Sequence, residues 1–315
     1  MAGHATPTEV ASKDAQHRPE PVVEAIWSGV ATLGECPLWD GRRGLLFWID
    51  SLQQKVWACG PHGEDPRCWS VPDVIGSIGL CRDERLIAGC RRGFGIVTLG
   101  DGGIAAIEWL GDPEPERLDN RLNDGKVDRA GRFWCGSMHE GFVVGRGALY
   151  RLDPDLRWHR VDSGFTVSNG LAFSPDGTRL YFSDSREDRS YQYDLDPRSG
   201  AAAGRRAFVD TTAYAGRIDG ATVDADGNYW AALFEGGAVA CFSPDGVLLR
   251  RIALPVGSPT MCCFGGPGLE TLFVTSATFH MTGVERDRDP QSGSLFAVRG
   301  LGVGGLEEPR FAYPP

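Results

Sequence analysis

The sequence lacks the features that mark several common classes of protein. Its 315 residues include 32 basic and 42 acidic side chains, for a formal net charge of −10, and no long run of Lys or Arg. Such an acidic chain is a poor partner for the phosphate backbone of nucleic acids. No apolar run approaches the roughly 20 residues of a membrane-spanning helix. We therefore expect neither a nucleic acid nor a membrane as partner, and no feature implies a protein partner.

Specific motifs are missing as well. The chain has no Gly-x-Ser-x-Gly nucleophile motif, no Cys-x-x-Cys and no pair of His at a zinc-binding spacing. Its nine cysteines are an odd number, and several lie in apolar runs, which is typical of buried free thiols in a reducing compartment. Residues 1–20 hold no apolar segment of the kind that a signal peptide needs. We expect a cytoplasmic protein with a disordered leader over 1–22 and a single domain over 23–315.

Glycine and proline, in contrast, are abundant. The chain contains 43 Gly and 20 Pro, together about a fifth of all residues and well above average usage. Because there are no low-complexity runs, this excess predicts many tight turns and hence many short strands. No segment longer than about ten residues shows a clean helical apolar period, so few helices are expected.

A repeat organises the chain. In each copy a turn, in most cases rich in Asp and Gly, leads into an apolar or aromatic run, and a second strand-like run follows. The first runs are anchored, at steps of about 38 to 48 residues, by Trp48, Leu86, Phe133, Tyr181, Tyr229 and Leu272. A period of ~40–50 residues with several short strands is typical of a β-propeller. The sequence thus predicts an all-β protein, a six-bladed β-propeller. Two β-sandwich domains are the alternative, but no linker supports them.

Polar residues recur at one place in this repeat. Equal offsets from the anchors place residues at equivalent positions of successive blades. Counting back about ten to thirteen residues from each anchor reaches Glu35, Ser77, Asn123, Asn169, Asp219 and the pair Pro259–Thr260. If these positions precede the innermost strands, their side chains all face one mouth of the central channel.

Four of these residues would form a cluster of oxygen ligands. Glu35 and Asp219 contribute carboxylates, and Asn123 and Asn169 contribute amide oxygens. This set suits a divalent cation such as Ca²⁺, Mg²⁺ or Mn²⁺. The other interpretation is that the Asn-Gly and Asp-Gly pairs are turn residues only. The shared register, which includes a Glu with no preference for turns, favours the metal site.

Further charged residues lie near this register. Arg121 and Lys126 flank Asn123, where they either contact an anionic or hydroxylated ligand or pair with acids. Glu140 follows His139 at the end of the expected third inner strand, where it either rims the mouth or belongs to an exposed loop.

The stretches around these residues resemble the senescence-marker-protein/gluconolactonase family, also called the regucalcin family. The resemblance covers roughly residues 25–300. It is carried by residues 33–39 (LGECPLW), 121–128 (RLNDGKVD), 131–138 (GRFWCGSM), 168–177 (SNGLAFSPDG), 219–224 (DGATVD), 263–267 (CFGGP) and 272–277 (LFVTSA).

The resemblance implies a six-bladed propeller that holds one divalent metal cation, with Ca²⁺, Zn²⁺, Mn²⁺, Mg²⁺ and Fe²⁺ as candidates. It assigns Glu35, Asn169 and Asp219 as metal ligands. Asp219 would also be the catalytic residue that transfers a proton. Arg121 and Asn123 would bind the sugar of the substrate.

Two positions depart from the family pattern. Cys36 stands where Gly is usual after the metal-binding Glu. Some members place a substrate-binding acid adjacent to the position of Glu140 or two residues beyond it, whereas Gly141 follows here. Glu140 is therefore the candidate for the substrate-binding acid, and the exact sugar is left open.

The expected function is metal-dependent hydrolysis of a small-molecule sugar lactone to the free sugar acid. Two alternatives stay open: another metal-dependent esterase or organophosphate hydrolase at the same site, and a non-enzymatic calcium-binding propeller. A polar pocket favours a polyol lactone, whereas an ester or organophosphate pocket should be apolar.

Overall fold

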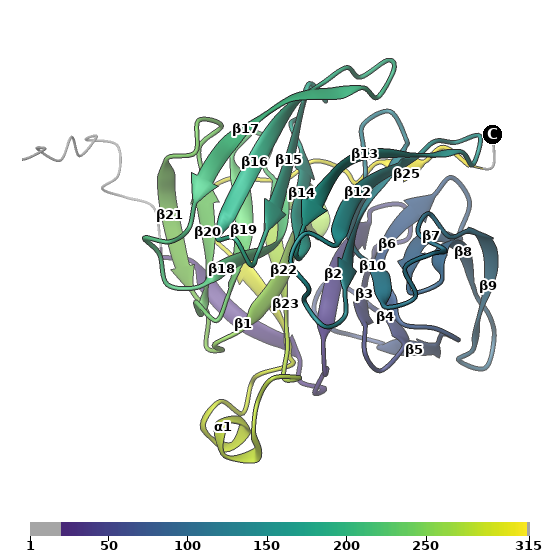
Figure 1. Cartoon of the computed structure of the whole chain (residues 1–315). Coiled ribbons are helices and arrows are strands. Elements are labelled where there is room, and N and C mark those ends of the chain that lie inside the picture. The colour runs from purple at the N-terminus through teal and green to yellow at the C-terminus, as the bar shows by residue number, and fades with distance from the viewer. Residues whose placement is uncertain (1–19, 314–315) are drawn as a thin grey trace, which may run out of the picture.

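The computed structural model describes residues 20–313, so most of the leader predicted over 1–22 lies outside the described residues. These residues form six sheets arranged in a ring (Figure 1). Each sheet has four antiparallel strands, and one gains a short fifth strand from the C-terminal segment. The prediction of an all-β, six-bladed propeller is confirmed, and the alternative of two β-sandwiches is wrong.

The first strand of each blade lines the central channel, because it packs against the first strands of both neighbouring blades. These innermost strands are β2 (Gly34–Asp40), β6 (Ile75–Cys81), β10 (Asn120–Val127), β14 (Ser168–Phe173), β18 (Arg217–Val223) and β22 (Pro259–Gly265).

The other strands of each blade follow outward in order. The second strands are β3 (Leu45–Asp50), β7 (Leu86–Cys90), β11 (Phe133–His139), β15 (Arg179–Asp184), β19 (Tyr229–Phe234) and β23 (Thr271–Ser276). The third strands are β4 (Lys55–Cys59), β8 (Gly93–Leu99), β12 (Gly147–Leu152), β16 (Arg189–Leu195), β20 (Ala238–Phe242) and β24 (Leu295–Arg299). The outermost strands are β5 (Arg67–Ser70), β9 (Ala105–Gly111), β13 (Trp158–Phe165), β17 (Ala202–Asp210), β21 (Leu248–Ala253) and β1 (Val22–Trp27).

The ring is closed by pairing between the two ends of the chain. The N-terminal strand β1 pairs antiparallel with β24, with Val23 opposite Val298. β1 thereby completes the blade formed by β22, β23 and β24. β1 begins at Val22, the last residue of the predicted leader.

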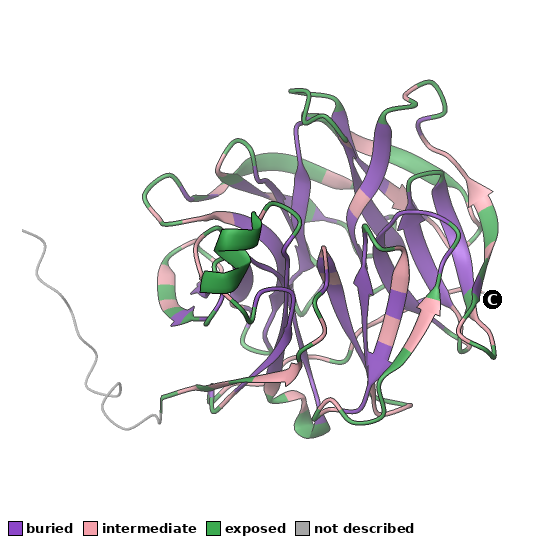
Figure 2. Cartoon of the chain, turned by 90° about the horizontal axis from the view of Figure 1, so that it is seen from below, coloured by how far each residue is buried: buried purple, intermediate pink, exposed green. Residues whose placement is uncertain are grey.

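The hydrophobic core consists of layers between neighbouring blades. One layer joins Trp134 and Leu149 of the third blade to Phe182 of the fourth, and similar clusters fill each of the other blade interfaces. The first, second and third strands are accordingly buried, while parts of the outermost strands and most loops are exposed (Figure 2). Burial of this apolar surface, at about 25 cal/mol per Å², stabilises the ring.

Two of the turns that revealed the repeat share a hydrogen-bond pattern. Asp128 Oδ2 accepts from Trp134 Nε1 at 2.8 Å, and Asp224 Oδ2 accepts from Trp230 Nε1 at 2.8 Å. In both turns Oδ1 accepts main-chain N–H groups. The aromatic runs after these turns are second strands, β11 and β19. The expectation that Glu140 follows an innermost strand is therefore wrong.

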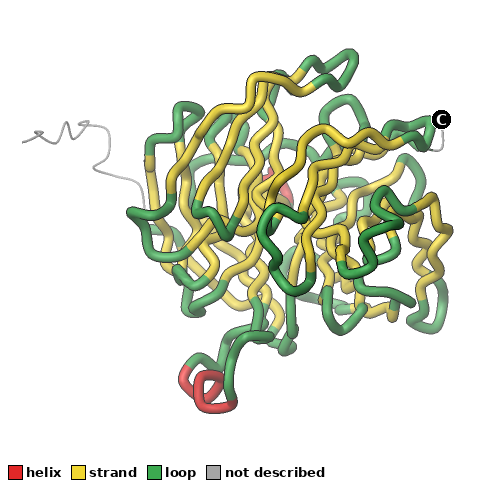
Figure 3. The backbone as a smooth tube through the Cα atoms, in the orientation of Figure 1, coloured by secondary structure: helices red, strands yellow, loops and turns green. Residues whose placement is uncertain are grey.

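Helical structure among the described residues is limited to α1 (Gly283–Arg288) and the short 3₁₀ turn η2 (Pro267–Leu269). α1 lies in the connection between β23 and β24, which projects from the ring (Figure 3). A capping box fixes its start, because Thr282 Oγ1 accepts from Glu285 N and the Glu285 carboxylate accepts from Thr282 N. Within residues 20–313, no helix has the length and apolar character needed to cross a membrane.

The C-terminal segment crosses one end of the channel. Its strand β25 (Arg310–Phe311) pairs in parallel with the last residues of β6. Earlier in the segment, Gly305 N donates to Leu269 O at 2.8 Å. Glu308 pairs with Lys126 of β10, with 3.4 Å between Oε1 and Nζ. The segment therefore covers the end of the channel at which the innermost strands finish.

Candidate metal and substrate site

Each innermost strand carries one extra residue near its start. In β10, Leu122 pairs with Ser137 of β11 and Gly125 pairs with Cys135, so two residues of β10 lie opposite one residue of β11. Such β-bulges redirect side chains out of the regular alternation of a strand. The corresponding shifts in the other blades fall between Glu35 and Leu38, Ile75 and Ser77, Asn169 and Ala172, Ile218 and Ala221, and Pro259 and Cys262.

The residues predicted to share a register lie at these bulges. Glu35 and Asn169 are the last paired residues before their bulges, whereas Asn123 and Asp219 lie one residue further on, within their bulges. The predicted common register therefore holds to within one residue and is not an exact equivalence. Their expected placement before the strands is wrong, because the bulges turn them toward the channel from within the strands. The connection that carries α1 lies at this same mouth, since it follows β23, which returns antiparallel to β22.

Hydrogen bonds join the polar side chains of the third and fourth blades. Arg121 Nη1 donates to Asn123 Oδ1 at 2.6 Å. Asn123 Nδ2 in turn donates to Asn169 Oδ1 at 2.8 Å and to the Ser168 carbonyl at 2.9 Å. The two Asn side chains therefore meet across the blade boundary, as the shared register predicted.

Glu35 and Asp219 form a pair of interacting acids beside this row. Burial, and then repulsion from Asp219 and from Asp124, raises the pKa of Glu35 well above its ordinary value. Burial, and then repulsion from Asp124, raises the pKa of Asp219 in the same way. Arg121 opposes both shifts. Burial lowers the pKa of the Arg121 guanidinium itself. Arg217, which pairs with Glu235, opposes only the shift of Asp219, so Arg121 is the cation that the two acids share.

Asp124 is a third buried acid that the sequence analysis did not single out. Its Oδ2 accepts from Leu171 N of β14 at 2.8 Å, whereas its buried Oδ1 has no partner among the described residues. Burial raises the pKa of Asp124 to about 6. Asp124 lies in the same bulge as Asn123. Its position directly after Asn123 in the sequence is the signal by which it could have been found.

The donor set fits a divalent cation. Among residues 20–313 no three His, Cys, Asp or Glu side chains are grouped to hold a metal, and the candidate ligands here are two carboxylates and one amide oxygen. Glu35 and Asp219 supply two carboxylates whose repulsion a cation would remove. Asn169 Oδ1 accepts one hydrogen bond and keeps a second lone pair. Two carboxylates and one amide are hard oxygen ligands with room for water or substrate.

Glu140 lies at the rim rather than among these ligands. Its carboxylate accepts from Arg91 Nε at 3.1 Å and also contacts Nη2 of the same arginine. The side chains of both residues are partly exposed. The sequence analysis did not consider Arg91. Positive and negative side chains thus alternate from Arg121 to Glu140 and then to Arg91 at the edge of the mouth.

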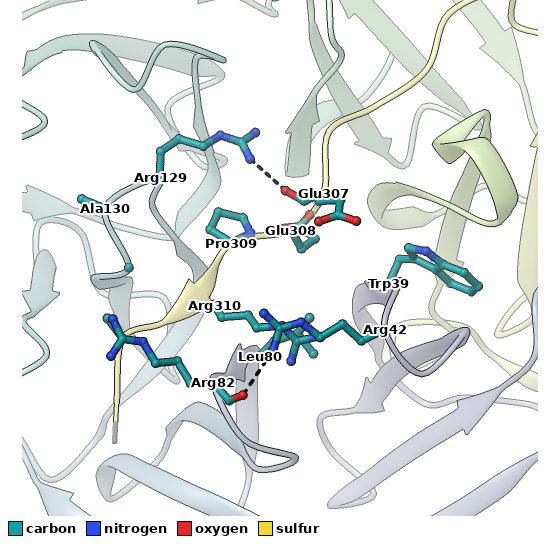
Figure 4. A pocket seen from close by; sticks show the side chains of 13 residues that line it. Trp39, Arg42, Leu80, Arg82, Arg129, Ala130, Glu307, Glu308, Pro309 and Arg310 are labelled. Atoms are coloured by element: carbon teal, nitrogen blue, oxygen red, sulfur yellow. Dashed lines mark hydrogen bonds between the residues drawn. The ribbon is translucent and has the colours of Figure 1, made fainter. Parts of the chain in front are cut away.

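The residues at the opposite end of the channel form a separate cavity. It measures about 440 Å³ and is lined by residues of the first three blades and of the C-terminal segment, and none of the predicted site residues lines it. Arg129 Nη1 donates to the Glu307 carbonyl and Arg42 Nη1 to the Arg82 carbonyl, as Figure 4 shows. Lys126, one of the two basic residues flanking Asn123, pairs with an acid at this end.

Cys36, the departure from the family pattern, has φ 49°. This is the left-handed region in which Gly is favoured, which explains the usual residue. Its Sγ accepts from Ile78 N at 3.2 Å and donates to Ile78 O at 3.3 Å, which binds the bulge of β2 to β6. All nine cysteines are free, and eight of them are buried.

The chain is similar to several known proteins. The family model for the SMP-30/Gluconolactonase/LRE-like region matches residues 33–278. A 6-deoxy-6-sulfogluconolactonase of Pseudomonas putida is 37% identical over 90% of this chain and 96% of its own. An L-arabinolactonase of Azospirillum brasilense is 34% identical over 90% of this chain and 93% of its own. The crystal structure of regucalcin from Agrobacterium tumefaciens, described as a calcium-binding protein, has a TM-score of 0.86 at 27% identity and covers 91% of this chain and 96% of its own.

Proposed function

Because the chain belongs to the SMP-30/gluconolactonase/LRE-like family, we propose that it hydrolyses the lactone of a sugar acid to the free acid. The protein is then an enzyme that acts on a cyclic ester. The observation that carries the proposal is the hydrogen-bonded row from Arg121 through Asn123 to Asn169 beside the acids Glu35 and Asp219. One divalent cation is held by Glu35, Asn169 and Asp219.

The side chains at the mouth have distinct roles in this reaction. A bound divalent cation supplies Lewis acidity at the lactone carbonyl. Asp219 takes a proton from the water that attacks the carbonyl carbon. It returns this proton to the ring oxygen when the ring C–O bond breaks. Arg121 and Asn123 hold hydroxyl groups of the substrate and so orient the ring for attack.

The chemistry of the mouth favours a polyol lactone over an apolar ester. Arg121 and Asn123 offer hydrogen-bonding groups, and the Arg91–Glu140 pair continues the polar surface to the rim. An organophosphate or simple ester would leave these groups unpaired, at a cost of about 1–3 kcal/mol for each buried group. The named relatives act on a sulfonated hexonolactone and on a pentonolactone, so both classes belong in a substrate panel.

A lactone panel tests the proposal. The full-length protein is offered gluconolactone, 6-deoxy-6-sulfogluconolactone, arabinonolactone, xylonolactone and galactonolactone, and acid release is followed with a pH indicator. Each rate is corrected for spontaneous hydrolysis. We expect hydrolysis of at least one sugar lactone, loss of activity with a chelator and recovery on adding a divalent cation. A rate at the spontaneous level for every lactone, in protein that has bound its cation, would reject the enzymatic function.

We also propose a cytoplasmic location. It is supported by the nine free cysteines, since disulfides are rare in reducing compartments. Burial raises the pKa of most of these thiols, for example that of Cys81 to about 12, which keeps them protonated and unreactive. Mass spectrometry of the protein, isolated from its native cells with free thiols alkylated at lysis, should find no intramolecular disulfide. Two or more disulfides would contradict this location.

A further inference from the structure

A chain of four hydrogen bonds runs around the mouth through three blades. All its donors point in one direction. The bonds are Arg121 Nη1 to Asn123 Oδ1 (2.6 Å), Asn123 Nδ2 to Asn169 Oδ1 (2.8 Å), Asn169 Nδ2 to Ser185 Oγ (2.8 Å) and Ser185 Oγ to the Ile218 carbonyl (2.6 Å). The last acceptor belongs to the residue directly before Asp219.

The direction of this chain is determined by its two ends. A guanidinium can only donate hydrogen bonds, so the side chain of Asn123 must turn its oxygen toward Arg121. A carbonyl can only accept, so the single hydroxyl proton of Ser185 is committed to Ile218. The Ser185 oxygen can then only accept from Asn169. Each Asn is thus left with one amide orientation.

This orientation decides what Asn169 presents to the cation. With its nitrogen on Ser185, its oxygen lies on the side of Asn123 and the mouth. The reversed amide would present an NH₂ group to the cation instead. We propose that Ser185 is a positioning residue, which holds Asn169 in the orientation needed to ligate the divalent cation. This inference rests on the metal site of the proposed function.

Ser185 is itself held rigidly. It directly follows Asp184, the last residue of β15, whose carboxylate accepts from the main-chain N–H groups of Thr166 and Val167 at 2.6 and 3.1 Å. Ser185 N donates to the Val167 carbonyl at 3.1 Å, and the residue is only 7% exposed. A side chain fixed by so many contacts can impose its own geometry on Asn169.

The first blade contains a matched turn without this function. Asp50 accepts from the N–H groups of Thr32 and Leu33, and Ser51 N donates to the Leu33 carbonyl, as in the fourth blade. The Ser51 hydroxyl, however, is buried and has no hydrogen-bond partner within residues 20–313. The ligand of this blade is Glu35, a carboxylate with two equivalent acceptors that needs no amide partner to orient it. Ser51 therefore provides a control at the same position of the repeat.

The test compares Ser185→Ala, Ser185→Thr and Ser51→Ala in the full chain. Mn²⁺ and Ca²⁺ are titrated calorimetrically into metal-free protein at one pH. Ser185→Ala removes the acceptor of Asn169 Nδ2 and leaves the amide held only through Asn123, so it should weaken cation binding about 10–100-fold, the usual effect of removing a partner of a metal ligand. Ser185→Thr keeps the hydroxyl and should bind nearly as the wild type does, and Ser51→Ala should be unchanged. At saturating metal, Ser185→Ala should recover most of its kcat on the lactone.

Other outcomes separate the two proposals. Equal affinity of Ser185→Ala and wild type would overturn the role of Ser185 and leave the metal site intact. Equal weakening in Ser51→Ala would overturn it as well, because the effect would then be a general loss of stability. If the wild type binds neither cation, the metal site fails, and this inference fails with it. If Ser185→Ala does not fold, Ser185→Cys takes its place: its thiol is a weaker acceptor, and wild-type affinity in that folded variant would overturn the role.

Discussion

The two ends of the channel differ in how their charged side chains are paired. At the end where the innermost strands finish, Lys126 and Glu308 pair at 3.4 Å, and both are largely buried. At the end where the strands begin, the half-buried Glu35 and the buried Asp219 interact, with Arg121 as their main cation. The first arrangement is electrostatically complete, whereas the second leaves like charges facing one another. Repulsion between the two acids destabilises the fold. A pair of acids in such a place points to a positively charged ligand that removes the repulsion.

The C-terminal segment explains why one end is complete. It brings Glu308 to Lys126 and adds β25 to the end of β6. Arg310 of this strand contacts the buried carboxylate of Asp40 and donates to the Cys81 carbonyl at 3.0 Å. No comparable segment of the described chain crosses the other mouth. The C-terminal segment thus covers one end of the channel, and the other end is the location of the proposed site.

The largest expected effect is on the kcat of Asp219→Asn, a variant that separates proton transfer from metal binding at the open mouth. Asp219→Asn can still offer an oxygen to the cation but cannot accept a proton. With metal at saturation, its kcat should fall by roughly 10²–10⁴, the scale of losing a general base. Lactone hydrolysis is measured as acid release, corrected for the spontaneous reaction.

The control for this variant is Asn123→Ala. It removes a substrate contact and the hydrogen bond to Asn169 Oδ1, while Ser185 still holds the Asn169 nitrogen. At saturating metal it should therefore mainly raise KM. A near-normal kcat for metal-saturated Asp219→Asn would assign the proton transfer to another group.

A change at the closed end should affect stability and not chemistry. Glu308→Gln leaves the buried ammonium of Lys126 without its carboxylate. The free energy of unfolding should fall by about 1–3 kcal/mol, as chemical denaturation measures. The kcat per folded molecule should be unchanged. A loss of kcat at full folding would show that the two ends are coupled and would remove the contrast.

The smallest expected effect is a pH dependence of the metal-free protein. The raised pKa values of Glu35 and Asp219 mean that the folded state keeps protons that the unfolded chain has already released. Their contribution to stability is therefore favourable below the ordinary carboxyl pKa near 4 and is lost as the pH rises toward the raised values.

Asp219→Asn removes one of the two charges and should reduce this loss. Relative to wild type, the Tm of the metal-free variant should rise by a few degrees between pH 4 and pH 8. Saturating metal should reverse the order, because only the wild type keeps both carboxylate ligands. A difference in Tm that stays constant across this pH range would contradict the repulsion between the two acids.

Much of the fold was readable from the sequence, because it repeats. In the turns before Phe133 and Tyr229, an Asp carboxylate holds a Trp of the following strand in the same way. The repeat placed Asn123 and Asn169 within one residue of the same register, and their side chains do meet. The bulges were not predicted, because one extra residue in a strand leaves no distinctive sequence pattern.

Apart from Asp124, the residues that were missed lie outside the repeated register. Ser185 follows a second strand, and its contact with Asn169 depends on how the chain returns at the mouth. Glu308 is 182 positions from Lys126, and only the folded C-terminal segment brings it there. Arg91 reaches Glu140 from a neighbouring blade. Contacts of this kind depend on how the blades pack against one another, and the periodicity of the sequence does not contain this information.

Titration with a divalent cation tests the central claim most directly, namely that the open mouth is a metal site. Wild-type protein should bind one cation per chain, because Glu35, Asn169 and Asp219 form a single set of hard oxygen ligands. Glu35→Gln, Asn169→Ala and Asp219→Asn should each weaken binding strongly, since each removes a ligand or its charge, while Glu308→Gln should bind as wild type does. Unchanged affinity in all three mouth variants, or no binding by the wild type, would contradict the account.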